Sequence, residues 1–227
     1  MKKHTNAFII VGVIVILISC LSPYEGDNLV LFGLPGSGTQ ITLSDLFTQP
    51  DHLNANVYRF YTNDTKYRTT TGYTLWTYCS DPVTFQERIV TVRKPVGSSS
   101  AGYGVVICAD QRLVVDRMET VFLTVMINNN RQYAIGKVFN AVYKQLVNWT
   151  DGAGLIKGTG LSHKIKITKD TGNPNKYDLY FNDVFECSFV DEEAPRCEGA
   201  GRNGYVVVIA QDDLYSSGVE VWFTENL

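Results

Sequence analysis

Side chains that could perform acid–base or nucleophilic chemistry are few and widely spaced in this 227-residue sequence. Asp191, Glu192 and Glu193 are consecutive and run into Ala-Pro, so their carboxyl groups point in different directions. A retaining glycoside hydrolase instead holds two carboxyl groups about 5 Å apart. His52 and His163 have no second histidine at a metal-binding spacing. The sequence therefore predicts no catalytic carboxylate pair and no metal site built on histidine.

The N-terminus has the layout of an export signal. Two lysines precede an apolar run over residues 7–18, which is shorter than the roughly 20 apolar residues of a membrane-spanning helix. The run leads into Leu17-Ile18-Ser19-Cys20, which resembles the lipobox of bacterial lipoproteins. The resemblance implies a signal peptide over residues 1–19, cleavage between Ser19 and Cys20, and lipid attachment at Cys20. An ordinary cleaved signal peptide and a marginal membrane anchor are the alternatives.

Lipidation would make the bilayer the first partner of this protein. Two acyl chains anchor a protein stably where one chain is marginal. Leu21 follows the cysteine, whereas an aspartate at that place retains lipoproteins at the inner membrane in the sorting pattern that the resemblance implies. We therefore expect an exported protein of the bacterial cell envelope, with the outer membrane favoured. Residues 20–27 would form a short tether.

The remaining cysteines are candidates for disulfides, because disulfides persist in exported proteins. Four cysteines allow three pairings, and the sequence does not decide among them. The preferred pairing joins Cys187 to Cys197, which closes a short loop, and Cys79 to Cys108. The alternative is that some of these residues are buried thiols.

Downstream of the tether, the sequence predicts an all-β chain. Short segments rich in β-branched and aromatic residues alternate with Asn-, Asp- and Gly-containing turns. The predicted strands are Phe122–Ile127, Gln132–Val138, Lys164–Thr168, Tyr177–Phe181, Val184–Val190, Tyr205–Ala210 and Val219–Phe223. One helical turn is expected near Leu43–Phe47, and the pattern loosens over Asp81–Gly104, where Pro95–Ala101 is expected to be a flexible loop. Residues 28–227 are expected to form a single β-sandwich domain.

The order of these segments resembles that of a known superfamily. A glycine-containing strand (Gly102–Ile107), a hairpin (Phe122–Lys137), a loop tryptophan (Trp149) and the segment Tyr177–Phe189 follow one another as in concanavalin A-like and laminin-G-like domains. The resemblance implies a two-sheet antiparallel jelly-roll sandwich. The superfamily contains both lectins and glycosidases, so it predicts the fold more directly than the function.

The same resemblance suggests where a ligand would bind. Sugar-binding faces stack aromatic rings on pyranose rings, and Trp149 with Asn148 and Asp151 beside it is the candidate platform. Packing in the structure is the alternative role for this tryptophan. Calcium is another ligand of such domains, and the candidate loop carboxylates belong to Asp110, Asp151, Asp170, Asp212 and Asp213.

The charge of the chain excludes one class of partner. The formal net charge is −3 and no basic block occurs, which argues against nucleic-acid binding. The sequence therefore favours a membrane-anchored lipoprotein with a non-enzymatic domain that binds glycans or matrix components. A lipid-anchored glycoside hydrolase of the same superfamily, or a protein-binding component for adhesion or envelope assembly, is the alternative.

Overall fold

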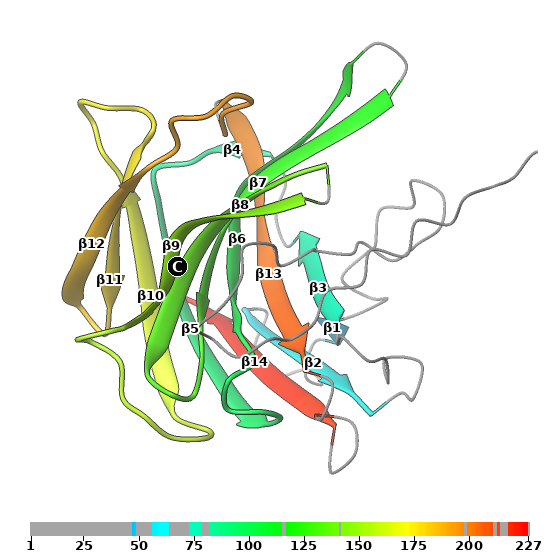
Figure 1. Ribbon diagram of the computed structural model, residues 1–227, viewed down its shortest axis with the longest axis vertical. Helices are drawn as coiled ribbons and strands as arrows, with labels where there is room; N and C mark the ends of the chain where they lie inside the picture. The colour runs from blue at the N-terminus through cyan, green and yellow to red at the C-terminus, as the bar shows by residue number, and fades with distance from the viewer. Residues whose placement is uncertain are drawn as a thin grey trace, which may run out of the picture.

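The computed structural model describes residues 47–48, 56–63, 73–78, 82–114, 117–140, 142–197, 199–210, 213 and 218–226. Strands make up most of this part of the chain (Figure 1). Their bounds are β1 Phe47–Thr48, β2 Val57–Thr62, β3 Tyr73–Tyr78, β4 Val83–Thr84, β5 Glu87–Val96, β6 Tyr103–Val114, β7 Arg117–Ile127, β8 Gln132–Phe139, β9 Val142–Asp151, β10 Ser162–Lys169, β11 Lys176–Phe181, β12 Val184–Val190, β13 Ala200–Ile209 and β14 Val219–Glu225. No helix in the described residues has the length and apolar character of a membrane span.

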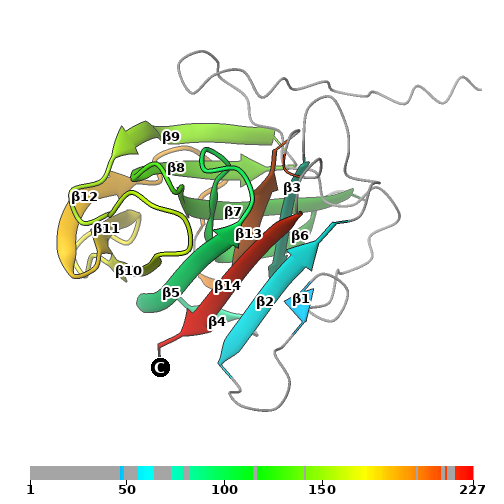
Figure 2. The ribbon, with the colours of Figure 1, turned by 90° about the horizontal axis from the view of Figure 1, so that it is seen from below.

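The strands form two antiparallel sheets. Sheet A has the order β3-β13-β6-β7-β8-β9. The short strand β4 also pairs with β13, outside this order. Sheet B has the order β1-β2-β14-β5-β10-β11-β12. In Figure 2, strands β9, β8 and β7 of sheet A lie above β5, β14 and β2 of sheet B. The arrangement confirms the predicted all-β, two-sheet antiparallel sandwich.

The core between the sheets follows from the period of two in the strands. In β11, Tyr177, Leu179 and Phe181 are buried, while the residues between them are partly exposed. The opposite wall of the core includes Val105, Leu123 and other apolar residues of sheet A. All seven strands predicted from this alternation lie within or overlap observed strands. The hairpin between β11 and β12 turns at Asn182 and Asp183, which have φ values of 50° and 68° that Asn and Asp tolerate.

Strand β5 lies where the sequence pattern loosens, and the apolar alternation does not predict it. Two of its core-facing positions carry cations, Arg88 and Lys94, which hide the period of two. Lys94 is fully buried, and its Nζ donates hydrogen bonds to the carbonyl oxygens of Ser98 at 2.9 Å and Ala101 at 3.3 Å. The segment expected to be a flexible loop is therefore partly strand, through Val96, and two carbonyl groups of the remainder are hydrogen-bonded to Lys94.

Three further local predictions differ from the structure. The sequence Arg202-Asn203-Gly204 predicts a turn, but these residues lie inside β13. The pairing with β6 is irregular there because β6 carries an extra residue, so that Val106–Ala109 lies opposite Arg202–Gly204. Phe47, at the end of the expected helical turn, lies in strand β1, and the rest of that turn is outside the described residues. Trp149 lies in strand β9 and not in a loop. Strand β9 has two register shifts against β8, and these obscure its alternation.

Candidate functional site

A cavity of about 920 Å³ opens where strands of sheet B approach β13 of sheet A. Its volume falls within the range of roughly 300–1,000 Å³ that is usual for small-molecule sites. Most of the lining side chains carry amide, hydroxyl or charged groups. The lining residues are Asn56, Tyr58, Glu87, Arg88, Ile89, Thr91, Lys164, Asn203, Glu225 and Asn226.

Arg88 contributes to the part of the cavity nearest the core. Its Nη1 donates hydrogen bonds to the carbonyl oxygens of Val106 and Gly204, both at 2.8 Å, and its Nη2 donates to Oε1 of Glu225 at 2.6 Å. The Tyr205 hydroxyl donates to the same Glu225 oxygen at 2.6 Å. The β6–β13 pairing is irregular next to these carbonyl groups, so the guanidinium supplies donors where the ladder is interrupted. Arg88 thereby links the two sheets and fixes the Glu225 carboxylate.

The outer part of the cavity is built from the other face of β5. Glu87, Ile89 and Thr91 alternate with the core-facing residues of that strand, and Thr91 pairs with Lys164 of β10. The Asn226 amide donates a hydrogen bond to the Thr91 hydroxyl at 2.8 Å. Sequence reasoning misses this site because its residues come from five segments that are distant along the chain. One signal in the sequence could have indicated it: Arg88 and Lys94 occupy positions of β5 that face the core.

The cavity suits hydrogen-bonded recognition better than acid–base catalysis. Two carboxyl groups line it, but each is held by a cation: Glu225 by Arg88 at 2.6 Å, and Glu87 by Lys166 at 3.0 Å. The hydrogen bond with Glu87 also raises the pKa of Lys166. A glycosidase uses a pair of carboxyl groups to act on the glycosidic bond, and both carboxyl groups of this cavity are already engaged in ion pairs.

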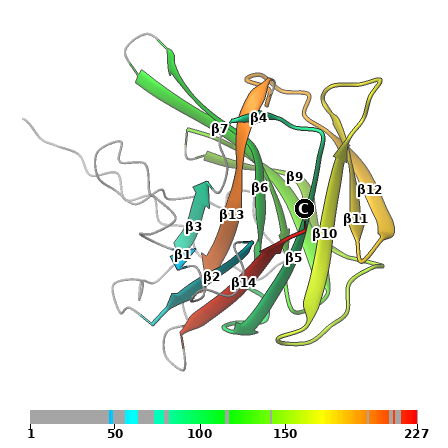
Figure 3. The same ribbon diagram turned by 180° about the vertical axis from the view of Figure 1, so that it is seen from behind.

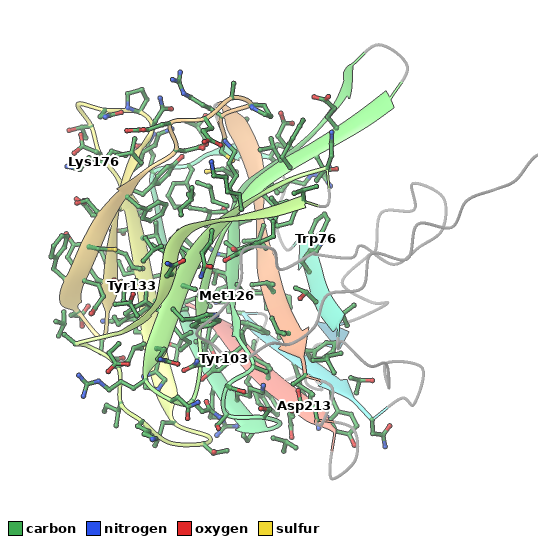
Figure 4. The ribbon with its side chains drawn as sticks, viewed as in Figure 1. Trp76, Tyr103, Met126, Tyr133, Lys176 and Asp213 are labelled. Carbon is green, nitrogen blue, oxygen red and sulfur yellow. The ribbon has the colours of Figure 1, made fainter. Side chains whose placement is uncertain are left out.

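Trp149, the predicted sugar platform, lies away from this cavity, on the outer face of sheet A. An added Cβ at Gly102 would lie 3.0 Å from Cη2 of Trp149 and 3.3 Å from Sδ of Met126, so the indole packs closely on that glycine. Trp76 and Met126 belong to the same apolar cluster, on β3 and β7 (Figure 4). Trp149 is half-buried and its neighbours Asn148 and Asp151 are exposed. The structure thus brings the three predicted residues together on β9, with the tryptophan ring packed against the sheet.

The described cysteines are free thiols. Cys187 and Cys197 are not bonded to each other, so their predicted pairing is wrong in this structure. Cys108 is also free, and its predicted partner Cys79 lies outside the described residues, as do Ser19 and Cys20. The side chain of Cys187, on β12, contacts Tyr133. Cys197 lies beside Asp191, whose carboxylate accepts a hydrogen bond from the Cys197 backbone N–H at 2.8 Å.

We expect Cys108 and Cys197 to resist alkylation in the native protein. Both are buried, and burial raises the pKa of Cys108 to about 11 and also raises that of Cys197. Only the thiolate is nucleophilic, so little reactive species is present near neutral pH. Iodoacetamide labelling followed by mass spectrometry should modify them only after unfolding, without added reductant. A requirement for reductant would show that these cysteines form disulfides.

His163 is buried in the structure. It is 1% exposed, and its Nδ1 lies 3.4 Å from the Asn182 side-chain nitrogen. No group of three or more His, Cys, Asp or Glu side chains within the described residues is placed to hold a metal ion. Asp170, a calcium candidate, accepts hydrogen bonds from the backbone N–H groups of Gly172 at 2.7 Å and Asn173 at 2.9 Å. These bonds lower its pKa.

The buried position of His163 predicts a loss of stability in mild acid. Burial lowers its pKa below the ordinary value of 6.5, so the unfolded chain binds the proton more readily than the native protein does. This contribution to stability is present above about pH 6.5 and is lost as the pH falls through the native pKa. Urea unfolding at about pH 7.5 and about pH 5 should show a decrease that is smaller in His163→Gln. An identical decrease in both proteins would contradict this assignment.

Comparisons with known proteins support the fold. No family model matches the sequence, and no curated protein matches it. Among solved structures, a carbohydrate-binding module, CBM66 from Bacillus subtilis, is similar at 9% identity and a TM-score of 0.50, covering 74% of this chain and 84% of that one. A glycoside hydrolase family 16 protein of Bacteroides ovatus, solved with its G4G4G3G product, is similar at 8% identity and a TM-score of 0.51, covering 79% and 84%. The fold is therefore the predicted jelly-roll sandwich.

Proposed function

We propose that this protein binds glycans in the cavity beside β5 and does not process them. The main support for this proposal is the composition of the cavity, which is lined by three asparagine amides together with hydroxyl and charged groups. Sugars present many hydroxyl groups, and these are matched by side chains that both donate and accept hydrogen bonds. Arg88 and Asn226 hold parts of this lining in fixed positions, which reduces the cost of ordering them on binding.

The comparisons agree with a sugar ligand. One similar structure is named as a carbohydrate-binding module, and another contains a glycan product. Folds host unrelated functions, so this similarity adds to the chemistry of the cavity and does not replace it.

Asn226→Ala should weaken glycan binding about tenfold, because it removes an amide that lines the cavity and its bond to Thr91. A glycan array should first identify a ligand, and calorimetry should then measure the affinities. Asn148→Ala is the matched control, since it removes an exposed asparagine beside Trp149 on the other sheet. Loss of binding in the control alone would move the site to β9, and silence of the folded protein on the array would overturn the proposal.

A glycoside hydrolase is the second candidate, because Glu87 and Glu225 line the same cavity. If the protein hydrolyses a bound oligosaccharide, Glu87→Gln should abolish the release of reducing ends. If the wild-type protein releases none from a glycan that it binds, this candidate fails.

For the N-terminus we propose lipid attachment at Cys20 after removal of residues 1–19, with the domain held at the cell envelope. The support is the lipobox resemblance of Leu17–Cys20. Expression of the full chain in bacteria with labelled palmitate should mark the protein, and Cys20→Ala should remove the label. A labelled Cys20→Ala protein would contradict this proposal.

A further inference from the structure

Two arginines flank a tryptophan on the outer face of sheet B. Trp222 of β14 pairs with Arg59 of β2 on one side and with Arg93 of β5 on the other. The guanidinium carbons of Arg59 and Arg93 lie 5.4 and 5.6 Å from the centroid of the indole ring, within the range of cation–π contact. Figure 3 shows the three strands side by side. We call these three residues the Arg–Trp–Arg patch.

The two arginines of the patch differ in their charge balance. Arg59 forms an ion pair with Glu220 at 2.7 Å, and the Trp222 indole N–H donates to the same carboxylate at 3.0 Å. Arg93 is exposed, and within the described part of the chain it contacts the indole but no carboxylate. The patch therefore offers one guanidinium that is held by an aromatic ring and is not neutralised by an acid.

The patch adjoins the cavity along the same face of the sheet. Thr91, which lines the cavity, precedes Arg93 by two residues on β5, so both side chains project to the outer face. Opposite them on β14, Thr224 pairs with Thr91 and Trp222 pairs with Arg93. A ligand longer than the cavity and leaving it along β5 would meet Arg93 next.

We propose that the glycan bound by this protein is acidic, and that Arg93 binds a carboxylate or sulfate group on the sugar unit outside the cavity. This inference rests on the proposed glycan-binding function. A planar guanidinium forms two parallel hydrogen bonds with such an anion, and stacking on Trp222 holds it in position for that contact. Glu220 and Arg59 position the indole, so they act through Trp222 and not on the ligand.

The test compares charged and neutral oligosaccharides of equal length by calorimetry: an oligogalacturonate, a sulfated galactan oligosaccharide and a neutral galactan oligosaccharide. We expect the wild-type protein to bind at least one acidic oligosaccharide about tenfold more tightly than the neutral one, with a preference that falls as salt is added. Arg93→Gln should remove the preference for the acidic ligand over the neutral one. The two acidic ligands separate a carboxylate from a sulfate.

Lys144→Gln is the matched control, because it removes an exposed cation from β9 of the other sheet. Circular dichroism should show that both variants are folded. Equal binding of acidic and neutral ligands by the wild type, or a preference that survives Arg93→Gln, would overturn the inference while the glycan proposal stands. Absence of binding to any glycan would overturn the proposed function itself.

Discussion

Lys137→Met is expected to lower the free energy of unfolding by about 3–5 kcal/mol, because it leaves a buried carboxylate without its cation. Lys137 projects from β8 into the interior, and its Nζ lies 2.5 Å from Oδ1 of Asp191. The side chains are only 5% and 2% exposed. Asp191 also holds the backbone of Cys197, so the ion pair attaches the segment after β12 to sheet A. Urea denaturation monitored by circular dichroism measures the difference.

A second lysine on the neighbouring strand is the control for this measurement. Lys144 pairs with Glu193, but the side chains are 54% and 60% exposed. Exposed ion pairs contribute roughly 0–1 kcal/mol, since water solvates both ions when they separate. We therefore expect Lys144→Met to have little effect. Similar losses in the two variants would mean that burial does not distinguish the pairs.

Arg88→Met is the second variant with a large expected effect, also about 3–5 kcal/mol. Methionine fills a similar length but donates no hydrogen bonds, so the Val106 and Gly204 carbonyl groups and the Glu225 carboxylate lose the donor they share. Because these groups belong to both sheets, the substitution should destabilise the sandwich as a whole. Urea unfolding measures the loss.

The control for Arg88 lies on the same strand. Arg93 faces outward and is exposed, so Arg93→Met should change stability by no more than about 0.5 kcal/mol. Arg88→Lys should fall between wild type and Arg88→Met, because an ammonium group keeps the charge without the fork of donors. A wild-type stability in Arg88→Met would contradict the role of this residue in joining the sheets.

The strands that the sequence predicts most directly are those whose inward positions are mostly apolar. Tyr177, Leu179 and Phe181 alternate cleanly with polar neighbours, and β11 lies where that pattern places it. In β5, two inward positions carry cations. Lys94 is held by carbonyl groups of the segment that follows the strand, whereas the carbonyl groups that hold Arg88 belong to the other sheet. A local pattern cannot indicate such partners.

The candidate site was less predictable than the fold for the same reason. Arg88 and Glu225 meet across 137 residues of sequence, and the cavity exists only because β5 and β14 are neighbours. Trp149 was the natural candidate from its sequence neighbours, yet Gly102 gives its ring a flat surface on which to pack. Cys108, Cys187 and Cys197 are free thiols, although export would favour disulfides.

The three tryptophans of the chain are divided between the two faces of the sandwich. Trp76 and Trp149 pack on the outer face of sheet A, and Trp222 stands between two arginines on sheet B. Intrinsic fluorescence can therefore locate a bound ligand without labelling. A change in emission on titration that disappears in Trp222→Phe would place the ligand on sheet B, whereas one that disappears in Trp149→Phe would place it on sheet A.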